Sequence, residues 1–204
     1  EHARTPPSPS AGAGYVAVEF AYLDFLLHKA VNLRVGNVLI PSGFINEGHE
    51  PTTFHGVLRP PVEREIIPTT WYDVGGGVFG EPIPGLRYKA YVVTGLVATN
   101  FTDSGWKDAR FRGNRGFTED PNFVVSAAYD DQKFVNVGAS FYYGRTGQLI
   151  YKDPADNNRF IGAKALLAEI HAQGKYRGIE ARALAALTSL EEADKLSMLK
   201  YPTG

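Results

Sequence analysis

The chain has 204 residues and a mass of 22.3 kDa, which is enough for one sizeable domain with a hydrophobic core. A formal net charge of -1 argues against nucleic-acid binding, because phosphate recognition needs a basic excess on one face. Cysteine is absent, which excludes disulfides, thiol nucleophiles and cysteine-ligated zinc. No run of about 18 apolar residues occurs, so the sequence predicts no transmembrane helix, whereas barrel strands would show only a weak alternating signal.

The two ends of the chain carry few signals of regular structure. Residues 1–14 are rich in Pro, Ser, Gly and Ala and are predicted to form a flexible lead-in. The chain begins at Glu1 without a signal-peptide pattern, and residues 201–204 do not resemble a terminal strand. We therefore expect the sequence to be an internal piece of a longer chain.

Residues 15–188 are predicted to form a meander of about eight strands, because apolar and polar residues alternate along most of them. In the first strand, which starts at Tyr15, Asp24 interrupts the alternation and predicts a bulge near residues 22–24. The second strand is expected from Val31 to Pro41, and its alternation predicts a slip at Gly36 and Asn37. The strands after it are expected at residues 71–80, 86–96, 123–129 and 134–143.

The clearest pattern is a hairpin in residues 159–187 with its turn at Arg177 and Gly178. One parity carries Glu169, His171, Gln173, Lys175, Glu180 and Arg182. The other parity is apolar and includes Leu166, Ile170, Ile179, Ala183 and Leu187. Since side chains alternate faces along a strand, the hairpin has one charged face and one apolar face. A loop with a short helix is predicted to follow in residues 189–204.

Short turns alternate with long connections along the meander, and the long ones occupy residues 42–70, 99–122 and 144–158. This asymmetry is typical of bilayer-spanning barrels, in which tight turns lie at one end and extended loops at the other. Aromatic residues also stand where strands end, as in interfacial girdles. The fold class predicted is therefore all-β, an antiparallel up-and-down meander that forms part of a transmembrane β-barrel.

Several stretches together carry a family resemblance: LDFLLHKAVNLRVGNVLIPSGFINEGHEPTTFHGVLRPPVEREIIPTTW, VGGGVFG, GLRYKAYVVTGL, VGASFYYG and LLAEIHAQGKYRGIEARAL. They resemble Gram-negative outer-membrane porin-like proteins related to the phosphate-selective porin O and P group. The resemblance implies a many-stranded barrel, usually trimeric, that lies in the bacterial outer membrane and passes small solutes or ions. Eight strands are fewer than a water-filled porin needs.

Two sets of residues are candidates for contact with a solute. The pore-lining candidates share the polar parity of the strands and are Glu19, Arg34, Arg87, Lys89, Glu169, His171, Lys175, Glu180 and Arg182. The constriction candidates lie in the long connection 42–70, predicted to fold into the lumen, and are Glu47, His49, Glu50, His55, Arg59, Glu63 and Arg64. Because acids and bases are mixed, the wall suits a weakly selective pore better than a dedicated anion channel.

Other chemistries have weaker support, and no enzyme, cofactor or metal site is predicted. Residues 75–80 match G-x-G-x-x-G but precede no helix that could hold a pyrophosphate, so we expect glycines that let the strand pass under a folded-in loop. His49, Glu50 and His55 could ligate a metal but lack helical spacing. Glu169 and His171 could act in acid–base catalysis. Neighbouring charges of the same parity favour instead a solvated wall of paired charges.

The function expected is an outer-membrane porin that passes small hydrophilic solutes by diffusion, with residues 42–70 as its constriction. The alternative is a soluble lipocalin-like barrel or β-sandwich that binds a small ligand. The two predict opposite surfaces: the apolar parity meets lipid in the porin and is sealed inside the soluble protein.

Overall fold

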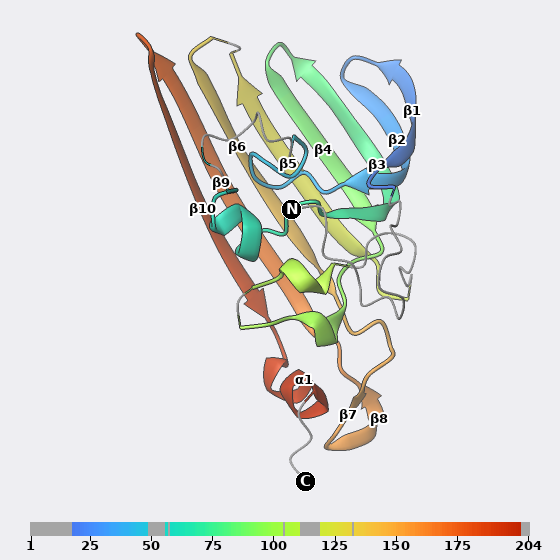
Figure 1. Ribbon diagram of the computed structural model, residues 1–204. Helices are drawn as coiled ribbons and strands as arrows, with labels where there is room; N and C mark the ends of the chain where they lie inside the picture. The colour runs from blue at the N-terminus through green and yellow to red at the C-terminus, as the bar shows by residue number, and fades with distance from the viewer. Residues whose placement is uncertain are drawn as a thin grey trace, which may run out of the picture.

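The computed structural model describes residues 18–48, 56, 58–103, 105–110, 119–131 and 133–200, without the side chain of Lys200. Eight strands form one antiparallel sheet in the order β1-β2-β3-β4-β5-β6-β9-β10 (Figure 1). Their bounds are β1 Ala21–His28, β2 Val31–Leu39, β3 Tyr72–Ile83, β4 Leu86–Val93, β5 Asn122–Asp130, β6 Val135–Arg145, β9 Lys164–Tyr176 and β10 Ile179–Leu190. The predicted meander is thus confirmed, and the sheet is open, since β1 and β10 do not pair with each other.

Short elements occupy the long connections. A π-helical turn η2 (Val62–Ile66) and two 3-10 turns, η3 (Ala98–Asn100) and η4 (Lys107–Ala109), lie in the first two connections. A two-stranded hairpin of β7 (Lys152–Asp153) and β8 (Asp156–Phe160) lies in the third, and the helix α1 (Ala193–Lys200) follows β10. Figure 1 shows α1 and the β7–β8 hairpin beyond the strand ends, opposite the short turns. Among the described residues, no helix has the length and apolar character needed to cross a membrane.

The strand registers give the sheet two chemically different faces. We call the outer face the one that carries Ile170, and the inner face the one that carries Glu169. Large apolar side chains of the outer face are exposed, namely Leu23, Phe25, Val31, Leu33, Val35, Val74, Val92, Phe123, Val125, Tyr129, Val135, Val137, Phe141, Tyr143, Ile170, Ile179 and Leu187. Among the paired residues, charges on this face are Arg145 and Lys164, which pair with each other at the end nearest the long connections.

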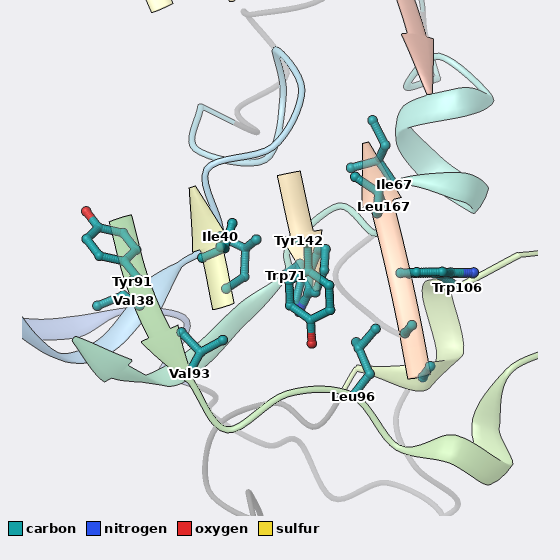
Figure 2. Packing of buried hydrophobic residues seen from close by; sticks show 13 residues of the cluster. Val38, Ile40, Ile67, Trp71, Tyr91, Val93, Leu96, Trp106, Tyr142 and Leu167 are labelled. Atoms are coloured by element: carbon teal, nitrogen blue, oxygen red, sulfur yellow. The ribbon is translucent and has the colours of Figure 1, made fainter. Parts of the chain in front are cut away.

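The hydrophobic core lies on the inner face, near the end of the sheet where the long connections begin. Sheet residues such as Val93 and Leu167 pack there against residues of the connections, such as Ile67, Leu96 and Trp106. Figure 2 shows the side chains of Trp71 and Tyr142 together in this cluster, and their ring centroids are 4.8 Å apart. The connections therefore cover part of the polar parity and leave the apolar parity bare.

The structure corrects the two predicted irregularities of the first strands. Asp24 is paired in regular register with Arg34, and the register shift of β1 lies between Phe25 and His28. The pairing of β2 with β3 also runs without a slip through Gly36 to Leu39. Val38 shares the parity of Arg34 because the inner face changes from polar to apolar along the strand, where the core covers it.

The role predicted for the glycines of β3 is also corrected. A Cβ on Gly75 would lie 2.1 Å from the carbonyl oxygen of Val92, and a Cβ on Gly77 would lie 2.0 Å from that of Ala90. Both carbonyls belong to β4, so these glycines permit close strand approach and do not make room for the loop. The strand continues to Ile83 and turns directly into β4 without a helix. The glycines therefore cannot form a dinucleotide-binding motif, which needs a helix N-terminus after them.

The last part of the chain differs from prediction in its boundaries. The main hairpin begins at Lys164, because Arg159 and Phe160 belong to β8, and it ends at Leu190. Its two-residue turn at Arg177 and Gly178 has positive φ angles of 48° and 84°, and the predicted turn is confirmed.

Candidate functional site

The candidate site is the inner face of the sheet with the segment that crosses it. The pore-lining candidates of β2, β4, β9 and β10 all lie on this face by register. Glu19 precedes β1 and is half-buried. We call the covering segment residues 41–48 and 58–70, the described parts of the long connection that contact this face.

Ion pairs hold the basic side chains of the inner face. Arg34 donates from Nε and Nη2 to the two carboxylate oxygens of Asp24, both at 2.7 Å. Its guanidinium carbon lies 3.8 Å from the ring centroid of Tyr22 and 4.8 Å from that of Phe79. A bidentate ion pair and two aromatic neighbours fix the position of the Arg34 guanidinium on the inner face.

Three further ion pairs lie nearer the short turns. Arg87 is 3.3 Å from Asp130. Glu180 is 3.3 Å from Lys175 and 3.0 Å from Arg182. The wall therefore presents its basic residues together with acids, as cross-strand or near neighbours.

One ion pair joins the covering segment to the wall. The Lys89 ammonium on β4 donates to both carboxylate oxygens of Glu47. Both side chains stay partly exposed. This contact brings the predicted constriction segment against the strand that carries a predicted pore-lining residue.

A second contact lies on β9. The Glu169 side chain is buried, with the residue 2% exposed, although the sequence pattern suggested a solvated charge. Its Oε2 accepts hydrogen bonds from Ser140 Oγ at 2.9 Å and from the backbone N–H of Gly43 at 3.3 Å. Its Oε1 lies 2.5 Å from His171 Nδ1. The carboxylate thus connects two wall residues to the covering segment.

An aromatic contact extends this attachment toward β10. The ring centroids of Phe44 and His171 are 4.5 Å apart, and the Arg182 guanidinium lies 5.6 Å from the Phe44 ring. A Cβ on Gly138 would meet the His171 ring at 2.5 Å, so this glycine leaves the space that the imidazole occupies. The covering segment therefore reaches across the inner face from β4 to β10.

Inside the covering segment, Glu63 acts as a hydrogen-bond acceptor. It is 4% exposed, and its Oε1 accepts the backbone N–H groups of Phe44, at 2.5 Å, and Ile45, at 2.9 Å. Burial raises the pKa of this carboxyl, while the two N–H donors oppose the rise. A Cβ on Gly43, whose φ is +72°, would lie 2.5 Å from the same oxygen. Glu63 therefore organises the segment from within.

Asn46 closes the base of the covering segment. Its side-chain amide donates to the carbonyl oxygens of Ile40 and Trp71, both at 2.7 Å, and its Oδ1 accepts the N–H of Trp71 at 2.7 Å. The two ends of the connection are therefore held together at the edge of the core.

The other predicted constriction residues have different placements. Arg59 donates to Thr69 Oγ1 at 2.8 Å, and Arg64 donates to Glu65 at 2.7 Å. His49, Glu50 and His55 lie outside the described residues. Within the part of the chain that the structure describes, no group of three or more His, Asp or Glu residues is arranged to hold a metal.

The inner face stays open near the short turns. One hollow of about 510 Å³ is lined by residues that include Asn32, Phe79 and Lys89, and another of about 330 Å³ is lined by residues that include Asn136 and Lys175. Polar and apolar groups share both surfaces.

The site residues that sequence reasoning missed include Asp24, Asp130 and Ser140. A regular hairpin with its turn at residues 29 and 30 would place Phe25 opposite Arg34, and the register shift between Phe25 and His28 brings Asp24 there instead, so the turn alone could not have predicted this pair. Ser140 pairs with Glu169 in register, but no sequence signal distinguishes it from other small inner-face residues.

Comparison with known proteins supplies one distant similarity. The chain is 33% identical over 189 residues to a protein of Aquifex aeolicus (strain VF5) that is named only as an uncharacterized protein. The match covers 91% of the chain and 41% of the relative, so the chain spans about two fifths of that protein's length. No family model matches the chain, and no solved structure matches it.

Proposed function

We propose that this sheet forms part of a transmembrane β-barrel in a bacterial outer membrane, and that the whole protein is a porin for small hydrophilic solutes. The observation that carries the proposal is the exposed, apolar outer face. Ile170 is 63% exposed and Ile179 is 73% exposed, whereas Glu169 on the opposite face is buried. An extensive apolar surface of this kind is unfavourable in water and favourable against lipid tails.

Strand length and connection pattern support the same proposal. The strands β3, β6, β9 and β10 have 11 to 13 residues, and a tilted strand needs about 9–11 residues to span a bilayer. Long connections leave from one end of the sheet and short turns from the other, as in outer-membrane barrels. Further strands would have to join β1 to β10 to close the barrel, since edges in lipid are unstable.

The soluble alternative requires the opposite arrangement. A lipocalin-like barrel or sandwich would bury Ile170 and Ile179 in its interior and expose Glu169. Their observed exposure opposes this alternative.

The paired charges of the inner face support general diffusion, with ions or small polar solutes as the permeating species. The trimeric state remains a prediction from the family resemblance.

The covering segment is proposed to narrow the pore. Deletion of residues 47–60 keeps Asn46 and Glu63, which organise the base of the segment, but removes the contact with Lys89. In planar bilayers, the whole protein should conduct, and the deletion variant should give a larger single-channel conductance. Heat-dependent migration on a detergent gel checks that each variant is folded. An unchanged conductance in a folded deletion variant would remove the constriction role.

A further inference from the structure

The charge pairs of the inner face differ in what they connect. Arg34 with Asp24, Arg87 with Asp130, and Lys175 and Arg182 with Glu180 each join residues of the sheet. The pair of Lys89 and Glu47 alone among these joins the sheet to the covering segment. It therefore lies where the proposed constriction approaches the wall.

The surroundings of Lys89 leave Glu47 as its compensating charge. Its cross-strand neighbours on the inner face are Phe79 on β3 and Ser126 on β5, and neither carries a charge. The nearby Arg34 lies against Phe79 but is engaged by both oxygens of Asp24. Removal of Glu47 would leave the Lys89 ammonium uncompensated, and removal of Lys89 would leave the Glu47 carboxylate uncompensated.

We propose that the Glu47–Lys89 pair determines the charge preference of the channel and keeps it weakly selective. This inference rests on the proposed porin function and adds the residues that set its selectivity. A fixed charge at a narrow point of a pore attracts ions of opposite sign and repels those of like sign. Both side chains are partly exposed, so a permeating ion can come close to whichever charge is left.

The test is the reversal potential of the whole protein in a planar bilayer under a salt gradient. Glu47→Gln should raise the anion-over-cation permeability ratio about two- to fivefold, the range that corresponds to one partly exposed charge. Lys89→Gln should lower the ratio by a similar factor. The exchange Glu47→Lys with Lys89→Glu restores a pair and should return the ratio to the parent value.

Glu191→Gln serves as the matched control. Glu191 pairs with Lys164 at 3.0 Å beyond the end of β10, away from the covering segment, so its removal should not shift the ratio. If Glu47→Gln and Lys89→Gln both conduct with the parent ratio, the inference is overturned. If the parent protein does not conduct, the proposed function itself fails, and the two failures are therefore distinguishable. If one single variant misfolds, the other decides the test, because a parent ratio in that variant alone overturns the inference.

Discussion

Single residues decide how the covering segment lies on the sheet. Glu63 and Glu169 are both buried carboxylates, and between them they accept the N–H groups of Gly43, Phe44 and Ile45. From the sequence both acids are expected among solvent-facing charges, because parity and loop position cannot show which acids meet backbone donors. Burial of a charge is tolerated here because each carboxylate is satisfied by hydrogen bonds.

The first prediction distinguishes the contribution of the Glu63 hydrogen bonds to stability from the contribution of its charge. Glu63→Ala leaves two buried N–H groups without their acceptor, and it should lower the free energy of unfolding by about 1–3 kcal/mol. Glu63→Gln keeps an acceptor oxygen and removes the buried charge, so at pH 7 it should be at least as stable as the parent. Urea unfolding of detergent-solubilised protein measures both values.

The pH dependence of Glu63 follows from the direction of its pKa. Because the folded pKa is raised, its stabilising contribution is complete below the unfolded value of about 4.5 and is lost as pH rises through the folded pKa. The parent should therefore lose stability relative to Glu63→Gln over that interval. A difference that stays constant with pH would contradict a role for the buried charge.

At the scale of elements, alternation predicted the strands well and the connections poorly. The hairpin of β9 and β10 follows from uninterrupted alternation and a two-residue turn with Gly178. The β7–β8 hairpin was missed because its strands have two and five residues, too short for a periodic signal. The apparent slip at Gly36 has a tertiary cause, since Val38 packs under the connections and not against water.

The second prediction concerns the attachment of α1 to the β7–β8 hairpin. Lys195 Nζ lies 2.5 Å from Asp153 and 3.3 Å from Glu192. The Lys195 hydrogen bond lowers the pKa of Asp153. Partial burial alone would raise the pKa of Glu192, but hydrogen bonds from the N–H groups of Gly162 and Ala163 and from Lys195, with the charge of Arg159, together lower it. With both folded pKa values depressed, the attachment is present above the usual acid range of about pH 4 and weakens as pH falls below it.

Amide hydrogen exchange of residues 193–200, expressed relative to the rate of an unstructured chain, measures this attachment. Protection should fall as the pH drops through the depressed pKa values. In Lys195→Met, protection should be lower at neutral pH and should change less with pH. Equal pH profiles for parent and variant would show that the ion pairs do not hold the helix.

At the scale of the whole molecule, the main feature is one open sheet with two chemically different faces. The sequence predicted both faces, because alternation persists over nearly all strands. The length of the connection 42–70 led to the expectation that it folds inward, but its packing around Trp71 and Tyr142 could not be predicted, since no local pattern records long-range contacts.

The most direct test of lipid contact uses single cysteines in the whole protein, with any cysteine outside these 204 residues replaced; the 204 residues themselves contain none. Spin labels at positions 170, 179 and 187 on the outer face, and at 173 and 182 on the inner face, would be measured in the whole protein reconstituted into liposomes. Collision with oxygen, which concentrates in the bilayer, should dominate at 170, 179 and 187, and collision with a water-soluble nickel chelate should dominate at 173 and 182. The reverse pattern, or contact with the chelate at all five positions, would contradict the membrane-spanning sheet.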